Sequence, residues 1–430
     1  MTCLHHRTLK WGVAMFTLIV GIAHAQEEAV IKRATQLRAA PGDSASSVVE
    51  LASNATVSRT SERQGAWIQV RAASGAVGWV HMFDIGAPVR DNPAAGALRH
   101  LGSKVSGGSS VSVATATAGI RGLGEGDVSR STGGGRVGSP GEGLQQADRL
   151  RASAENARTF AAAASLQARR VESLPAPASS SSASEAVAPT TPAPVRVENG
   201  DVLGHLLKSV ESVTDAQEAE LGSQMAVLLL HGKPLDPTPE LQRYVNRLGR
   251  WLSLQSTRPD LPWTFVVVDE SEFNAYSAPG GYVFVTRGLI DRCTDEAELA
   301  GILAHEIAHV INKHHLHAMH SAVRTGVPSN LAALVRHVHA LGYGAQAEHA
   351  ADREAVTLAA RAGLDPFGLV SALVQVNALG DSDLQFADAH PQSRLRLDHL
   401  EQAMARRLDP QAGTKAAVTI EQRLESSTLK

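Results

Sequence analysis

The segment His305-Glu306-Ile307-Ala308-His309 constrains this chain more than any other part of its sequence. Residues four apart lie on one face of an α-helix, so both imidazoles can reach a single ion. Glu306 follows His305 directly and lies close enough to take a proton from a water molecule that a metal ion activates. The spacing therefore predicts a helix that binds zinc and carries a general base.

The flanking residues predict that this motif is helical. Thr294 or Asp295 can cap the start of the helix, and Glu298 follows Asp295 at the spacing of a capping box. Because the chain contains 18 histidines, a chance match is the competing interpretation, and the motif needs a third ligand. Apolar residues at helical spacing give the segment a buried face: Leu299, Ile302, Leu303, Val310 and Ile311.

A candidate third ligand lies downstream, where Glu348 opens a helix-favouring run that also contains Asp352. Two histidines and one glutamate are an established ligand set for a catalytic zinc ion, which keeps one position open for water. Asp352 lies four residues after Glu348, on the same face, and can hydrogen-bond a ligand imidazole. A carboxylate on an alanine-rich helix can also be an ordinary solvated charge. Together with the motif, Glu348 is the predicted third ligand, and we expect one Zn²⁺ per chain, held by His305, His309 and Glu348.

These residues and their surroundings resemble the gluzincin metallopeptidases of the HtpX and CAAX-prenyl-protease type, metallopeptidase family 48. The similarity extends over about residues 205–405. Within this family, the chain resembles in particular the soluble periplasmic members, which degrade misassembled envelope proteins. Membrane-bound relatives place hydrophobic spans or long insertions between the second histidine and the third ligand, and the short span here argues against a membrane protease. Besides the zinc motif, the resemblance rests on residues 274–285, 288–289, 296–300, 348–353, 363–366, 390–391 and Arg396.

The resemblance implies an α+β fold for this region, mainly helical with a small β-sheet at the cleft. The residues agree, because 263–268 and 282–285 are typical of strands and a Pro-Gly-Gly cluster separates the second one from what precedes it. An edge strand beside a protease cleft can bind substrate backbone as an added strand. An ordinary core hairpin is the competing interpretation. The predicted substrate-binding residues are Asn274, Gly280, Gly281 and Tyr282.

His390 gains its significance from the resemblance, since a histidine before proline is otherwise an ordinary loop residue. The resemblance implies a catalytic position beside the metal. There His390 either stabilises the tetrahedral oxyanion or occupies the open zinc position at rest. The two roles predict opposite effects of His390→Ala, a loss or a gain of proteolysis.

Residues 1–25 are typical of a secretory signal peptide. Arg7 and Lys10 form its positive start, residues 11–22 its apolar core, and residues 23–25 a small-x-small cleavage site. An uncleaved anchor is the competing interpretation, but the apolar run is short for a membrane span. No later segment reaches about 18 apolar residues, so we expect no stable span after cleavage and a periplasmic or secreted protein.

A second, smaller domain is predicted at residues 28–86. Short β-rich runs separated by glycine, proline and serine are typical of a small all-β barrel, and their order resembles the bacterial SH3-like domain. That resemblance implies a cell-wall or envelope component as a partner. Trp67 and Trp79 could line the binding groove or belong to the barrel core.

The remaining boundaries follow from composition. Residues 87–198 are predicted to be a low-complexity linker with a helix at 143–173, either solvated or docked, and residues 199–409 to be the peptidase domain. Helices are expected within that domain at 214–231 and 239–255. Residues 410–430 form a polar tail. Because linkers separate the barrel from the peptidase domain, we expect few contacts between them.

Four histidines follow the zinc motif: His314, His315, His317 and His320. They could bind a second metal ion. However, they come from the end of the predicted helix and the residues after it, so they do not obviously converge on one point. We expect a solvated or partly packed cluster.

The formal net charge of −3 is small for 430 residues, and without a basic tract we expect no nucleic-acid partner. The sequence predicts a secreted zinc endopeptidase that cleaves unfolded or misassembled envelope proteins, with Glu306 as general base. Two alternatives stay open. One is a chaperone-like binding protein whose zinc site is latched, and the other is a cell-wall peptide hydrolase targeted by the SH3-like domain.

Overall fold

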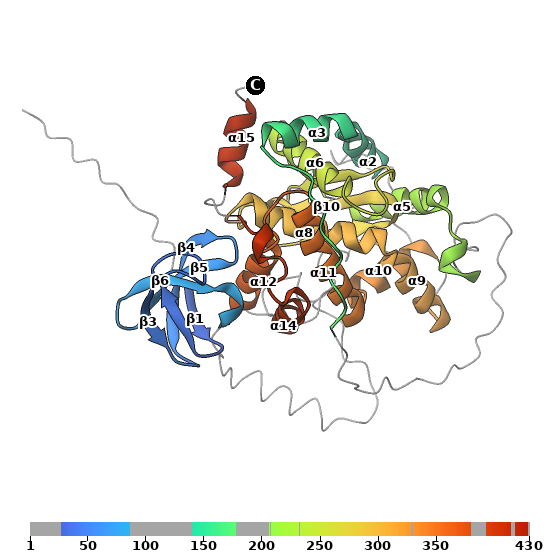
Figure 1. The fold of residues 1–430 in the computed structure, drawn as a ribbon. Helices are drawn as coiled ribbons and strands as arrows, with labels where there is room; N and C mark the ends of the chain where they lie inside the picture. Colours follow the sequence, from blue (N-terminus) through green and yellow to red (C-terminus); the bar gives the residue numbers. More distant parts are fainter. Residues whose placement is uncertain are drawn as a thin grey trace, which may run out of the picture.

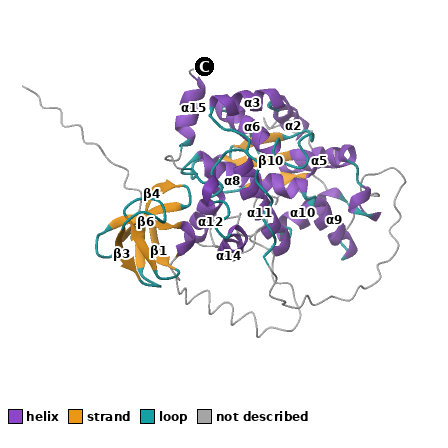
Figure 2. Ribbon diagram, viewed as in Figure 1, coloured by secondary structure: helices purple, strands orange, loops and turns teal. Residues whose placement is uncertain are grey.

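The computed structural model describes residues 27–86, 140–177, 206, 208–231, 233–327, 330–379, 393–413 and 418–428. The predicted signal peptide, at residues 1–25, and His390 lie outside this part of the chain. An all-β unit and a larger, mainly helical unit with a small sheet make up the described residues (Figures 1 and 2). The predicted α+β class with a small all-β unit is confirmed.

Seven strands form the all-β unit, which we call the barrel. Neighbouring strands are antiparallel in the order β3-β2-β6-β5-β4-β1-β7. Ile68, Val70 and Ala72 alternate with less buried residues along one strand, so the period of two directs them into the core. The strands are β1 (Glu27–Ile31), β2 (Thr35–Arg38), β3 (Ser47–Leu51), β4 (Thr56–Gln64), β5 (Trp67–Ala72), β6 (Val77–His81) and β7 (Ile85–Gly86), with a 3-10 turn, η1 (Met82–Asp84), before the last.

The helical unit contains a three-stranded sheet. β8 (Thr264–Val268) is parallel to β10 (Tyr282–Thr286), and β9 (Ala275–Ala278) is antiparallel to β10. Every residue of the three strands is buried, as their β-branched and aromatic residues predict. The strands expected at 263–268 and 282–285 are therefore confirmed, and β9 forms one edge of the sheet.

Helices surround this sheet (Figure 2), and the helices expected at 214–231 and 239–255 are confirmed as α5 and α6. No helix among the described residues is long and apolar enough to cross a membrane. The helices are α2 (Pro140–Arg149), α3 (Ala154–Ala163), α5 (Asp215–Leu229), α6 (Pro239–Ser253), α7 (Arg287–Ile290), α8 (Glu296–Ile311), α9 (His314–Arg324), α10 (Leu331–Leu341), α11 (Ala345–Arg361), α12 (Gly368–Leu379), α14 (Ser393–Met404) and α15 (Ile420–Thr428), with 3-10 turns η2 (Val210–Ser212), η3 (Pro279–Gly281) and η4 (Asp409–Gln411).

α8 contains the zinc motif and is buried along its whole length. Its start is capped by Asp295, whose Oδ1 accepts a hydrogen bond from the backbone N–H of Glu298 at 3.0 Å. Close contact with α12 needs glycine on both helices. A Cβ on Gly301 would lie 2.5 Å from the backbone nitrogen of Leu369, and one on Gly368 would lie 2.0 Å from the carbonyl oxygen of Ala297. The motif helix is therefore held rigidly inside the domain.

The helix expected at 143–173 is instead two helices, α2 and α3, which pack on α5 and α6. The ring of Phe160 lies 6.0 Å from that of Tyr244. Beyond α3 the chain continues along the domain surface, where Arg169 N–H donates to the carbonyl of Arg361 at 2.7 Å. Residues 140–177 are thus docked rather than solvated, because α2 and α3 bury apolar side chains against α5 and α6.

The predicted polar tail also packs on the domain. Ile420 of α15 is buried, and Arg423 forms two hydrogen bonds with the carboxylate of Glu296, at 2.6 and 2.8 Å. The backbone N–H of Glu296 donates to the carbonyl of Val418. Residues 418–428 therefore secure the first turn of α8, which composition alone did not indicate.

The expectation of few contacts between barrel and peptidase domain is wrong. Phe83 and His81 of the barrel lie 5.8 and 5.7 Å, by ring centroids, from Phe367. Arg63 of β4 reaches across the interface with its side chain only 4 % exposed. Figure 1 shows the barrel seated beside α12 and α14. The predicted linker joins the two units in sequence without keeping them apart in space.

Candidate metal centre

α8 and α11 bring the three predicted ligands together. His305 and His309 lie one turn apart on α8, and their Nε2 atoms are 3.0 Å apart. Glu348, in the first turn of α11, places Oε2 at 3.4 Å from His305 Nε2 and Oε1 at 3.5 Å from His309 Nε2. All three side chains are buried. They are the one set of three or more potential ligands in the described part of the chain whose ligand atoms lie within 4.8 Å of one another.

These distances fit a tetrahedral zinc ion. Around an ion bound at about 2.0–2.2 Å, tetrahedral ligand atoms lie about 3.3–3.5 Å from each other. Each imidazole Nε2 lies at this spacing from one oxygen of Glu348, His305 from Oε2 at 3.4 Å and His309 from Oε1 at 3.5 Å, while the two Nε2 atoms are somewhat closer, at 3.0 Å. Two nitrogens and one oxygen are also the donor set that zinc accepts at catalytic sites. The residues therefore fit Zn²⁺.

Asp352 and Arg396 hold His305 in place. Asp352 Oδ1 lies 3.0 Å from His305 Nδ1, and Arg396 of α14 binds both oxygens of Asp352, at 2.6 and 2.9 Å. Burial and Arg396 lower the pKa of His305, but the hydrogen bonds to Asp352 and Glu348 outweigh them and raise it to about 9. The imidazole thus carries a proton at neutral pH in the metal-free protein, and a bound cation has to displace it.

His309 is oriented by a different partner. Its Nδ1 lies 3.0 Å from Nδ1 of His314, at the start of α9. Burial lowers the pKa of His314 to about 4, so this ring is neutral and its Nδ1 can accept a hydrogen bond from the Nδ1–H of His309. The ring of Tyr343 packs on His309 with centroids 4.5 Å apart. The two contacts fix the plane of the second ligand imidazole.

Glu306 lies between the metal ligands and the sheet. Its Oε2 accepts a hydrogen bond from Ser277 Oγ of β9 at 2.7 Å. Its Oε1 is buried and has no hydrogen-bond partner among the described residues. A buried carboxylate oxygen without a donor is costly unless a proton or water reaches it. Ser277 thus occupies one oxygen of Glu306, and no described side chain hydrogen-bonds the other.

The edge strand β9 is also tied to α9. Nε2 of His315 lies 2.9 Å from the carbonyl oxygen and 3.2 Å from Oγ of Ser277. Burial lowers the pKa of His315 to about 3, so the ring is neutral and its Nε2–H donates a hydrogen bond to the carbonyl of Ser277. Ser277 therefore connects the strand, the general-base candidate and α9 at one point.

The four predicted substrate-binding residues lie just beyond the two ends of β9, and the structure describes their packing. Gly280 has a positive φ of 74° and presses on α5, where a Cβ would lie 2.5 Å from the Cα of Ala219. Gly281 faces Trp263, where a Cβ would lie 3.2 Å from the Trp263 Cα. The Tyr282 hydroxyl lies 3.3 Å from Asp148 of α2, and the Asn274 N–H donates to Thr286 Oγ1. Substrate contact by these four residues stays a prediction.

Sequence reasoning assigned no role to Arg396, Ser277, His314 or Tyr343. Arg396 and Ser277 belong to segments of the family resemblance, and His314 belongs to the histidine cluster expected to be solvated or partly packed. Arg396 and Ser277 act through partners far along the chain, Asp352 at 44 residues and Glu306 at 29, whereas His314 lies only five residues from His309. A repeating pattern does not encode such pairs. His390 lies outside the described residues, so its predicted role stays a prediction.

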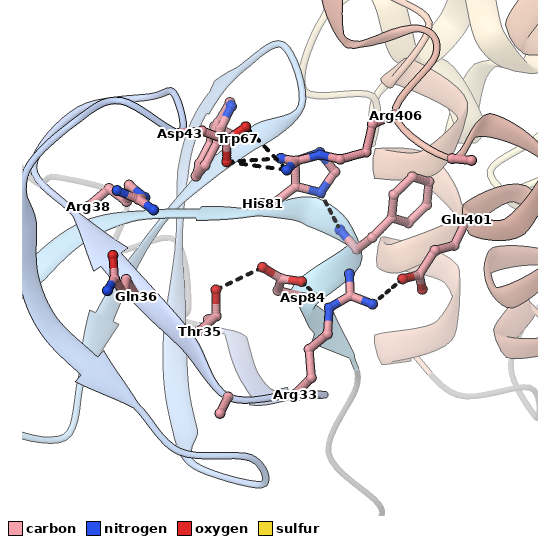
Figure 3. Close-up of a pocket in the computed structure, with 13 residues that line it drawn as sticks. Arg33, Thr35, Gln36, Arg38, Asp43, Trp67, His81, Asp84, Glu401 and Arg406 are labelled. Carbon is pink, nitrogen blue, oxygen red and sulfur yellow. Dashed lines mark hydrogen bonds and ion pairs between the residues drawn. The ribbon is translucent and has the colours of Figure 1, made fainter.

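A pocket of about 510 Å³ lies at the junction of the barrel and α14 (Figure 3). Trp67 lines it, in edge contact with His81 at 5.6 Å between centroids. Arg33 and Arg406 cross its rim, binding Glu401 and Asp43 respectively. Trp67 packs on the barrel core and also lines this pocket, and partner binding there stays a prediction.

Comparison with known families agrees with this geometry. Residues 237–404 match peptidase family M48, and residues 32–85 match the bacterial SH3 domain. The helical unit therefore contains a metallopeptidase domain of family M48, and the barrel is a bacterial SH3 domain.

Among individual proteins, the chain is similar to the Beta-barrel assembly-enhancing protease of Escherichia coli (strain K12). The two are 31% identical over 134 residues, which is 31% of this chain and 28% of the relative. The protein of the same name from Yersinia pestis is 33% identical over 108 residues, or 25% of this chain and 22% of the relative. Mitochondrial metalloendopeptidase OMA1 of Schizosaccharomyces pombe (strain 972 / ATCC 24843) is 29% identical over 175 residues, or 37% of this chain and 52% of the relative. The chain thus spans about a quarter of the bacterial relatives and about half of the yeast one.

Proposed function

We propose that this protein is a zinc-dependent endopeptidase of the cell envelope that cleaves unfolded or misassembled proteins. The observation that carries the proposal is the buried set of His305, His309 and Glu348 with the uncapped Oε1 of Glu306 beside it. A site that only stabilises the fold needs no such carboxylate next to its ligands. The domain match to family M48 supports the same chemistry.

In this mechanism His305, His309 and Glu348 hold the ion. When bound, Zn²⁺ supplies a Lewis acid that polarises the scissile carbonyl and lowers the pKa of water. Glu306 takes a proton from the attacking water and returns it to the leaving amine. Ser277 keeps Glu306 oriented through Oε2, so that Oε1 is the atom that receives the proton.

The proposed substrate class follows from β9, the edge strand beside Glu306. An extended chain that adds to a sheet edge is bound through its main chain, so it must be locally unfolded but need not have a fixed sequence. The bacterial relatives are named for assembly of β-barrels, and the predicted signal peptide at 1–25 supports an envelope location. Contacts by Asn274, Gly280, Gly281 and Tyr282, and a catalytic or latching role for His390, belong to this proposal.

Glu306→Gln tests the proposed function. The variant should keep zinc and fold while peptidase activity on a casein-type substrate falls by about two to four orders of magnitude, because only the general base is lost. A chelator should abolish wild-type activity, and added zinc should restore it.

Glu354→Gln is the matched control, since Glu354 lies on α11 and pairs only with Arg361, at 3.5 Å. It should behave as wild type. Wild-type protein that binds zinc and unfolded protein but never cleaves it would instead indicate a latched binding protein. Activity confined to purified peptidoglycan would indicate a cell-wall hydrolase.

A further inference from the structure

The SH3 barrel contributes a buried cation to the start of the metal-binding helix. Arg63 of β4 donates from Nη2 and Nε to Asp295 Oδ2, at 2.6 and 3.1 Å. Its Nη1 reaches Asp365 Oδ2 at 2.5 Å. The side chains of Arg63 and Asp295 are 4 % and 3 % exposed, so solvent hardly screens this pair.

Asp295 serves two partners with its two oxygens. Oδ1 caps α8 by accepting from the backbone N–H of Glu298, while Oδ2 takes the Arg63 guanidinium. Burial lowers the pKa of Arg63, but Asp365 and Asp295 outweigh it and raise the pKa, so the guanidinium stays charged. A negative cap also suits the helix N-terminus. Residues 232 positions apart in the sequence thus share one capping interaction.

The capped end is connected rigidly to the metal ligands. Glu298 accepts hydrogen bonds from Ser371 Oγ at 2.5 Å and from Gln375 Nε2 at 2.8 Å, which holds the first turn of α8 on α12. From Asp295 to His305 the helix rises about 15 Å without a break. Every residue of α8 is buried, and a densely packed interior transmits strain, so a shift of the first turn is expected to reach Glu306.

Other ion pairs join the barrel to α14, the helix that carries Arg396. Lys32 donates to Asp398 and Glu401, each at 2.9 Å, and Arg33 binds Glu401 beside the pocket of Figure 3. Lys32 and Arg33 are 32 % and 55 % exposed, so these pairs contribute little. Among the ion pairs described across this interface, that of Arg63 is the one buried from water on both sides.

We propose that Arg63 is a positioning residue for the metal centre, so that the SH3 domain sets the geometry of the peptidase site from the far end of α8. The proposal rests on the proposed function for its effect on catalysis. Its effect on metal binding and on the order of the helix does not depend on proteolysis. In this view the domain is part of the catalytic machinery as well as a module for partners.

The test uses the full chain and the variants Arg63→Gln, Arg63→Lys and Asp295→Asn. Arg63→Gln should weaken zinc binding and lower kcat by roughly tenfold each, with little change in KM, at a temperature where the variant is fully folded. Arg63→Lys should retain part of the zinc affinity and part of the kcat that Arg63→Gln loses, because an ammonium can pair with one carboxylate. Arg71→Ala, on the exposed face of the same barrel, is the control and should match wild type.

Asp295→Asn keeps an oxygen for the cap but removes the charge that Arg63 binds. The double variant Arg63→Gln/Asp295→Asn leaves neither partner of that pair as a lone buried charge, so it remains testable if the single variant unfolds. The double variant should lose no more zinc affinity and no more kcat than the worse of the two single variants, because the two residues act as one unit. Hydrogen exchange in the first turn of α8, measured on chelator-treated protein, should be faster in each variant.

Folded Arg63→Gln protein with wild-type zinc affinity, kcat and exchange would overturn the proposal, as would fully additive losses in the double variant. If the wild type shows no peptidase activity that depends on Glu306, the proposed function fails. Zinc affinity and exchange in α8 would then still decide the role of Arg63.

Discussion

At the scale of single residues, the site depends on charges that are buried yet paired. Burial alone would raise the pKa of Asp352, but Arg396 holds it well below its usual range. Asp352 is therefore ionised at neutral pH, and it binds Nδ1 of His305. Nε2 is left for the ion. The hydrogen bonds that join Arg396, Asp352 and His305 thus determine which ring nitrogen of His305 is available as a ligand.

Glu348→Ala should lower the zinc content per chain measured by atomic absorption after gel filtration. Two imidazoles alone hold the ion poorly, because the third donor and its charge are lost. Glu354→Ala on the same helix should bind zinc as the wild type does. Full zinc content with normal activity in Glu348→Ala would place the third ligand elsewhere, and His349 and His390 would be the next residues to test.

Asp352→Ala and Arg396→Ala should each reduce zinc affinity or kcat about 10–100-fold, the usual range when a partner of a ligand histidine is lost. Since both act through His305, the double variant should lose little more than the worse single one. If the loss in the double variant equals the product of the two single losses, Arg396 also acts independently of Asp352, for example through Glu348, 4.0 Å away.

Helical spacing within two short segments marks His305, His309 and Glu348 as candidate ligands and Asp352 as the partner of an imidazole, and the structure brings these side chains together. Ser277 could not be found in that way. It reaches Glu306 over 29 residues only because β9 lies beside α8, and a lone serine before a proline-glycine turn has no distinctive pattern. Local periodicity thus predicts ligands, while the residues that orient them depend on tertiary contacts.

At the scale of elements, β9 is the strand that connects the architecture of the site with the proposed substrate binding. It pairs with β10 on one side and is held by His315 of α9 through the carbonyl of Ser277. The same serine binds the general-base candidate. Movement of this short strand would therefore displace both the substrate edge and Glu306.

His315→Phe should destabilise the metal-free protein by about 1–3 kcal/mol, because a buried carbonyl loses its donor while an aromatic ring stays in place. Urea denaturation measures this effect. Under the proposed function, KM for an unfolded substrate should also rise as β9 loosens. His317→Phe, on the exposed side of α9, is the control. Unchanged stability in His315→Phe would mean that the carbonyl finds another donor.

Elements with a strong local pattern, α5, α6, α8, β8 and β10, were predicted correctly. The segment 143–173 was not, because its division into α2 and α3 is set by contacts such as that of Phe160 with Tyr244, 84 positions later. The polar tail was also misjudged. Arg423 docks α15 through Glu296, together with buried Ile420, and composition cannot indicate a partner 127 residues away.

At the scale of the whole molecule, the barrel and the peptidase domain pack directly against each other across one interface. Arg63 is buried between Asp295 and Asp365, and aromatic rings from both units meet at Phe367. Separating the two would expose these apolar rings and leave two carboxylates without their cation, a cost of several kcal/mol. The interface therefore favours a single cooperative unit.

The barrel and the peptidase domain should accordingly unfold together in denaturant. Hydrogen exchange of peptides from β5 in the barrel and from β10 in the peptidase domain, followed over a urea series, should give the same midpoint for both. Deleting residues 27–86 should lower the stability of the remaining domain and increase its aggregation, since Phe367 would become exposed. A barrel that unfolds at clearly lower urea while β10 stays protected would show that the contacts at Arg63 and Phe367 do not couple the two units. A truncated chain as stable as the intact protein would lead to the same conclusion.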